Sequence, residues 1–164
     1  MRNRIIRGAI LGVISAALVG GLVPNAGAVA IGNEGCTPGY WKNHQDNWEE
    51  YLPTDTLGDH ESDPSREWVI PDELASFRDV TFADALASGG GTGLDGAARI
   101  LFRATVAAYL NASHEGLGYP YRRFTSPFNI LSQLNAALAS LDRATMLKLA
   151  RTLDKANNLG CPLS

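Results

Sequence analysis

The chain of 164 residues contains two cysteines, Cys36 and Cys161, which stand near opposite ends of the sequence that follows an apolar leader. In an oxidising compartment an isolated pair is most simply explained by one disulfide bond. A bond that closes a loop on the order of 100 residues stabilises a fold by roughly 4–5 kcal/mol on the chain-entropy model. A metal-binding or catalytic thiol pair fits less well, because CxxC spacing is absent and no histidine stands near Cys161. The fold is therefore expected to bring both ends of the domain together.

The first 30 residues have the three-part layout of a secretory signal peptide. A basic start, MRNRIIR, precedes the apolar run GAILGVISAALVGGLV and the small-residue stretch PNAGAVA. Cleavage is expected after Ala28 or Ala30. A retained membrane anchor is the alternative, but the run is short for a bilayer span of about 20 residues. We expect residues 1–30 to be a cleaved signal peptide and residues 31–164 to form a single secreted domain without a membrane span.

The predicted mature domain is more acidic than the whole chain. The leader carries three arginines and no acid, so 11 basic residues remain against 17 acidic ones. An acidic balance disfavours non-specific binding to nucleic acid or to anionic membrane surfaces. We therefore expect no nucleic-acid partner, and a location in the extracellular space or the cell envelope.

Helical periodicity dominates the mature sequence, and no strand pattern extends beyond a few residues. Thr37 and Pro38 have the types that favour a helix start, and Pro53 would end a first helix of about four turns. Trp41, Trp48 and Leu52 would share its buried stripe. Three further helix starts and a cap for a short helix are expected at Asp95, at Ser126-Pro127, at Asp142 and at Thr81.

The segment from Asp95 to His114 is apolar around most of its circumference, which predicts a central helix surrounded by others. SGGGTG at 88–93 predicts a flexible connection or a tight bend, and the acidic segment 53–73 predicts a surface loop. The sequence thus predicts an all-α fold, a compact bundle of four to six helices with a long acidic loop and termini joined by one disulfide.

The acidic segment also offers carboxylates for a weak calcium site, because calcium takes six to eight oxygen ligands and can use flexible loops. The EF-hand spacing is absent, so a solvated acidic loop without metal is the competing interpretation. The three histidines, His44, His60 and His114, form no local ligand pair for zinc. No cofactor is predicted beyond weakly bound calcium, whose candidate ligands are Asp55, Asp59, Glu61 and Asp63.

Sequence motifs for catalysis are missing. No G-x-S-x-G elbow occurs, and Ser113-His114-Glu115 are neighbours in sequence, a spacing that does not orient a triad. No pair among the 17 acids is selected as a general acid and base. Asn111-Ala112-Ser113 matches the N-glycosylation triplet but lies inside a predicted helix. No catalytic residue is predicted.

The stretch GCTPGYWKNHQDNW at 35–48 is the densest in the chain, with two tryptophans, a tyrosine, a lysine and a histidine. Its first ten residues resemble the signature C-T-P-G-[YF]-W-K-N-H of a broad set of exported, largely uncharacterised microbial proteins. The resemblance continues through LDGAARILFRATVAAYLNASH and the last helical segment. It implies an exported module, stand-alone or appended, and brings no activity, cofactor or catalytic residue.

These observations favour a secreted, non-enzymatic domain that binds a glycan, a peptide or an envelope protein. Aromatic rings beside amides suit such ligands, and the expected ligand surface consists of Tyr40, Trp41, Lys42, Asn43 and His44. One alternative is a secreted hydrolase or metal-dependent enzyme, with a site assembled from His44, His60 and the acidic loop. Another is that the decapeptide serves only as a folding anchor.

Overall fold

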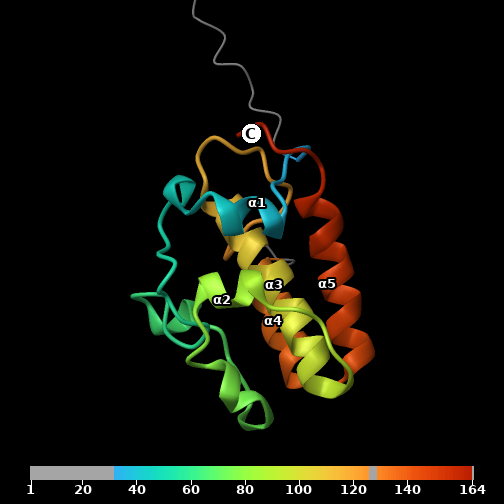
Figure 1. Ribbon diagram of the computed structural model, residues 1–164. Helices are drawn as coiled ribbons and strands as arrows, with labels where there is room; N and C mark the ends of the chain where they lie inside the picture. The colour runs from blue at the N-terminus through green and yellow to red at the C-terminus, as the bar shows by residue number, and fades with distance from the viewer. Residues whose placement is uncertain (1–31, 126–128, 164) are drawn as a thin grey trace, which may run out of the picture.

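The computed structural model describes residues 32–125 and 129–163 as a bundle of α-helices and short 3-10 turns (Figure 1). The predicted signal peptide and the predicted helix start at Ser126-Pro127 lie outside the described residues. Within these two ranges there is no β-strand, only three isolated bridges, so the all-α prediction is confirmed. The α-helices are α1 (Pro38–Asn43), α2 (Phe82–Ala87), α3 (Gly93–Ser113), α4 (Ile130–Ala139) and α5 (Arg143–Asn157).

The apolar helix α3 lies at the centre of the bundle, as the sequence predicts. Helix α5 runs along it, and α1, α2 and α4 also pack against it (Figure 1). Its side chains are buried on most sides; Leu101, Phe102 and Val106, for example, are fully shielded from solvent. The caps predicted at Thr37, Thr81 and Asp142 are confirmed, and α4 is capped by Asn129.

Helix α3 begins earlier than the sequence suggests. Its cap is Thr92, and Asp95 lies within the first turn. The preceding glycine segment makes a tight bend against the helix, because a Cβ atom on Gly96 would stand 2.1 Å from the carbonyl carbon of Gly91. The glycines at 91 and 96 thus allow the chain to turn directly into α3.

The two ends of the domain are joined as predicted. Cys36 and Cys161 form a disulfide, with Cα atoms 4.5 Å apart across 125 positions of sequence. The backbone N–H of Gly35 donates to the carbonyl of Gly160 at 3.0 Å, and a Cβ on Gly35 would collide with the carbonyl oxygen of Ala156. The disulfide therefore sits in a close backbone contact that only glycine at position 35 permits.

The first helix is shorter than predicted, and the expected helix over 38–52 is wrong. Helix α1 ends at Asn43, a 3-10 turn follows at Gln45–Asn47, and Leu52 is 62% exposed. Three backbone carbonyls of the helix bond to side chains instead of to the N–H groups of a further helical turn. Asn43 donates to the carbonyl of Gly39, a ring nitrogen of His44 meets that of Tyr40, and the Trp48 indole donates to that of Trp41. Local side-chain bonds of this kind compete with helix continuation.

The acidic segment is packed onto the bundle and is not a detached solvated loop. Leu57, Trp68 and Ile70 are buried, and the backbone N–H of Leu57 donates to the carbonyl of Val80. Trp68 stacks in parallel on Phe102 of α3, with ring centroids 6.0 Å apart. The apolar residues within this segment decide its position, whereas the acidic residues lie around them.

Candidate functional site

The aromatic residues of the opening motif are part of the core. Trp41 is 0% exposed, and its indole N–H donates to Oδ1 of Asn111 at 3.1 Å. Tyr40 is buried, accepts from the Asn47 amide and donates to the carbonyl of Leu163. Neither ring face is available for stacking on a sugar. Both rings stabilise the junction of the chain ends, and their burial argues against the predicted ligand surface at these two residues.

Asn111 of α3 connects this junction to the bundle. Its side-chain oxygen accepts from the backbone N–H of Cys36 at 2.7 Å as well as from Trp41, and its amide donates to the carbonyl of Cys36 and to Oδ1 of Asn157. Asn157 also accepts from the Tyr119 hydroxyl. Asn111 is 0% exposed, so the glycosylation triplet is inaccessible in the folded domain.

The other three residues of the predicted ligand surface, Lys42, Asn43 and His44, are exposed. His44 stacks on Tyr40, with ring centroids 4.2 Å apart, and Asn43 is held by Gly39. Lys42 differs from both, because its ammonium group makes no hydrogen bond or ion pair with any described residue. Lys42 thus carries a positive charge that no described residue of the fold pairs.

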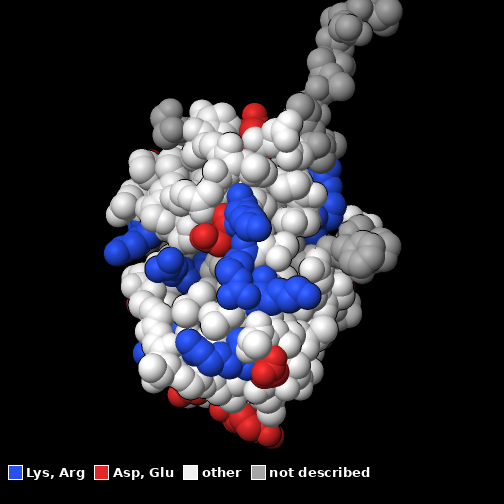
Figure 2. Space-filling view, turned by 90° about the vertical axis from the view of Figure 1, so that its right-hand side faces the viewer, with Lys and Arg blue, Asp and Glu red and all other residues white. Residues whose placement is uncertain are grey.

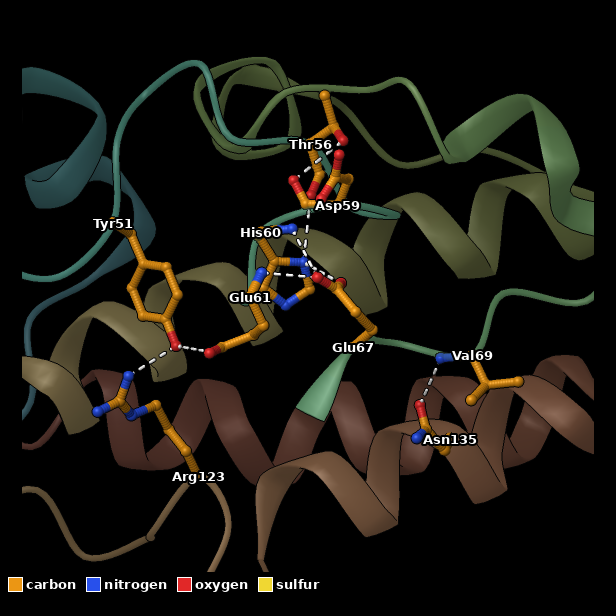
Figure 3. A network of polar contacts seen from close by, with 9 residues as sticks. All are labelled: Tyr51, Thr56, Asp59, His60, Glu61, Glu67, Val69, Arg123 and Asn135. Carbon is orange, nitrogen blue, oxygen red and sulfur yellow. Dashed lines mark hydrogen bonds and ion pairs between the residues drawn. The ribbon is translucent and has the colours of Figure 1, made fainter. Parts of the chain in front are cut away.

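The four predicted calcium ligands are not brought together. A carboxylate oxygen of Asp55 accepts from the backbone N–H of Leu52, and Asp63 caps a 3-10 turn at Pro64–Arg66. Glu61 accepts from the Tyr51 hydroxyl at 2.6 Å (Figure 3), and Asp59 is exposed. Among residues 32–125 and 129–163, no group of three or more histidine, cysteine or acidic side chains could hold a metal ion.

A buried histidine–glutamate pair lies at the centre of the same segment (Figure 3). Nδ1 of His60 is 3.2 Å from the carbonyl oxygen of Thr56 and 3.2 Å from Oε2 of Glu67. Both neighbours are acceptors, so Nδ1 carries the proton and Nε2 is left with a lone pair. Burial lowers the pKa of His60, which keeps the ring neutral. Oε1 of Glu67 accepts from the backbone N–H groups of His60 and Glu61.

This pair resembles the base and its orienting carboxylate in a hydrolase, but its environment does not suit catalysis. The His60 side chain is 0% exposed, and its ring packs against the aromatic rings of Trp68, Phe82 and Tyr109. Nε2 finds no hydrogen-bond partner among the described residues, so no nucleophile stands beside it there. The pair holds the acidic segment in place rather than facing a substrate.

A second polar chain in Figure 3 links this segment to the connection before α4. Arg123 donates to the Tyr51 hydroxyl at 2.6 Å. Arg123 also forms an ion pair with Glu50, which the figure does not draw, at 2.7 Å. Burial raises the pKa of Tyr51, which keeps the phenol protonated and able to donate to Glu61. The backbone N–H of Val69 donates to Asn135 of α4. These contacts fix the acidic segment to the connection before α4 and to α4 itself.

A different set of polar groups lines two clefts that share Arg103 and Asp154. The larger, of about 430 Å³, is formed where α1, α2, α3 and α5 meet, and the smaller, of about 140 Å³, lies between α3 and α5. We call the two together the basic groove. Its polar and charged lining residues are Thr37, Lys42, Arg103, Arg151, Asp154 and Asn158.

Charge is segregated in this molecule. Helices α3 and α5 carry six of the 14 lysines and arginines of the chain but two of its 17 acidic residues, whereas residues 49–84 carry 11 of the acids. The face on which α5 lies is turned to the viewer in Figure 2, and blue side chains gather across its middle. Arg103 and Arg151, like Lys42, form no hydrogen bond or ion pair with a described residue.

Sequence reasoning selected Lys42 but missed Arg103, Arg151 and Asp154. The available signal was local: Arg99 and Arg103 stand four apart, as do Arg151 and Lys155, so each pair shares a helix face. The sequence did not show that the two faces would line one groove beside Lys42.

Comparison of the chain with protein-family models, with curated proteins and with solved structures finds no match. In the part of the chain that the structure describes, no helix is both long and apolar enough to cross a membrane. The interpretation of the basic groove therefore depends on its own residues.

Proposed function

We propose that this chain is a secreted, non-enzymatic binding domain that recognises an anionic ligand outside the cell or in its envelope. The observation that carries the proposal is the convergence of Lys42, Arg103 and Arg151, without intramolecular partners among the described residues, on one groove of an acidic protein. Unpaired cations in a cleft raise the local potential and attract anions. We thus propose that the ligand binds in the groove beside Lys42 and not at the aromatic rings of the motif.

The proposed location rests on the leader and on the disulfide. A basic start, an apolar run and a small-residue end are typical of a signal peptide, and a structural disulfide is typical of an oxidising compartment. The resemblance of the decapeptide to exported proteins agrees with both. We propose that the leader is removed after Ala28 or Ala30.

The alternative of a hydrolase or metal-dependent enzyme receives less support. Its candidate residues are dispersed: His60 is sealed in the core, while His44 is exposed and stacked on Tyr40. The carboxylates of Asp55, Glu61 and Asp63 each accept hydrogen bonds elsewhere.

A general polyanion tests the proposed function. The purified mature domain should be retained on immobilised dextran sulfate at moderate ionic strength and eluted by salt, because exposed charges are screened beyond about 8 Å at 0.15 M. The double variant Arg103→Gln/Arg151→Gln should elute at a clearly lower salt concentration. Lys148→Gln is the matched control, since Lys148 lies on α5 but lines a different cleft, with Gln133. Equal elution of both variants and the wild type would contradict the proposal.

A further inference from the structure

We propose that the ligand of the basic groove is a linear glycan that carries carboxylates, of the uronate type, lying along α3 and α5. This inference rests on the proposed function and specifies its ligand. Along α5 the groove extends from Leu147 to Asn158, which corresponds to about 16 Å of helix. A groove of this length is suited to an extended chain of several units.

The charges that line the groove fit such a chain. Arg103 and Asp154 line both clefts, Arg151 lines the smaller one, and Lys42 of α1 lines the larger one. Guanidinium groups bind carboxylates through two parallel hydrogen bonds. Asp154 would repel a continuous row of anions, but its carboxylate can accept hydrogen bonds from hydroxyl groups. A uronate chain alternates carboxylates with hydroxyl groups, because each sugar ring carries one carboxylate and free hydroxyls.

The floor of the narrower part of the groove is aliphatic. Ile100 and Ala104 of α3 and Leu147 and Ala150 of α5 form it. None of the described residues that line the groove is aromatic, so a neutral sugar would lack a stacking platform there. Aliphatic side chains can still cover the C–H face of a sugar ring, while the charges supply the specificity.

An acidic peptide fits the groove less well. Extended peptides usually add to the edge of a sheet, and the described ranges contain no strand. The walls of the narrower cleft are the middle turns of α3 and α5, whose backbone groups are already paired within the helix. A helical peptide needs a wide apolar groove, whereas the larger cleft here is lined by Lys42, Arg103 and Asp154.

Nucleic acid also fits less well. Double-stranded DNA presents one charge for about every 1.7 Å of its axis, which is far denser than three cations and one carboxylate along this groove. The mature domain is also predicted to be acidic overall, which opposes binding to such a polymer.

Oligogalacturonates of one to six units test the inference by isothermal titration calorimetry of the mature domain, in buffer without divalent cations. Binding should tighten with chain length, by about tenfold or more from monomer to tetramer, as expected for one added charge-assisted contact. The methyl-esterified oligomers should not bind. Arg103→Gln should weaken binding by about tenfold or more, and Lys148→Gln should leave it unchanged.

Poly-L-glutamate and oligo-dT are the competing ligands in the same titration. If either binds more tightly than the uronate hexamer, or if affinity does not depend on uronate length, the ligand class is wrong while the proposed function stands. If the domain also fails to be retained by dextran sulfate, the proposed function fails with it.

Discussion

Asn111 and His60 show how single polar side chains hold this fold. Asn111 bonds to Cys36, Trp41 and Asn157 inside the core. Within the acidic segment, His60 connects Thr56 to Glu67. Both are buried, so their hydrogen bonds cannot be replaced by water without opening the structure. Each therefore allows a prediction at the scale of the residue.

Replacement of Asn111 by alanine should destabilise the domain strongly. The backbone N–H of Cys36 and the indole N–H of Trp41 would lose their acceptor, and a buried unsatisfied group costs about 1–3 kcal/mol. We expect a loss of about 3–5 kcal/mol in the free energy of unfolding, measured by urea denaturation. The control Asn43→Ala removes an exposed asparagine side chain that bonds only to the carbonyl of Gly39 and should change the free energy of unfolding by about 0.5 kcal/mol or less. Similar losses for both variants would exclude Asn111 as the central connection.

Stability should fall on mild acidification because of His60. Burial lowers the pKa of His60 in the folded state below its usual value of about 6.5, despite the nearby carboxylates of Glu61, Asp55 and Asp59. The unfolded chain then binds a proton that the folded chain does not, so stability is fully present above pH 6.5. It is lost as the pH falls from there toward the folded pKa, by at most about 1.4 kcal/mol per pH unit.

Urea denaturation between pH 7.5 and pH 5 measures this effect. His60→Gln should flatten the loss of stability over that range, whatever its stability at neutral pH, and the exposed control His44→Gln should leave the slope unchanged. If the His60→Gln and wild-type slopes agree, the histidine is not buried in its neutral form.

At the scale of the element, the sequence predicted helices whose starts are marked by a cap and whose faces are apolar. Helix α5 is found where Asp142 and its apolar repeat place it, and α3 is the central helix. The length of helix α1 was overestimated. Apolar periodicity over 38–52 does not reveal that the side chains of Asn43, His44 and Trp48 bond to backbone carbonyls of the helix. Periodicity reports which residues are apolar, whereas these side-chain bonds depend on rotamers.

The candidate site was only partly predictable for a related reason. Aromatic residues near a chain end suggested a stacking surface, but Trp41 and Tyr40 are buried by contacts with α3 and the C-terminal residues. Lys42 was selected, but its neighbours Arg103 and Asp154 lie at least 60 positions away in sequence. Their proximity follows from the packing of α1 against α3 and of α5 against α3, which no local pattern encodes.

At the scale of the whole molecule, the Cys36–Cys161 disulfide joins the two ends of the domain. It links the residues just before α1 to the residues just after α5. The double variant Cys36→Ser/Cys161→Ser should lose about 2–5 kcal/mol in the free energy of unfolding. Addition of a reductant should lower the urea midpoint of the wild type and leave that of the double variant unchanged. A wild type that resists full reduction without loss of stability would contradict a structural role for this bond.

Charge segregation is the second property of the whole molecule. Residues 49–84 use several of their carboxylates for internal contacts, including those of Glu61 and Glu67. The cations of the groove, Lys42, Arg103 and Arg151, have no such role among the described residues. Free cations gathered in one groove are suited to an anionic ligand.

Chemical-shift mapping with an oligogalacturonate hexamer, by nuclear magnetic resonance of the isotope-labelled mature domain, tests this claim most directly. We predict that the perturbed backbone and side-chain signals cluster at Lys42, Arg103, Arg151 and Asp154, and that they weaken as salt is added. Perturbations confined to the acidic segment, or no perturbation in the groove at ligand excess, would contradict the account.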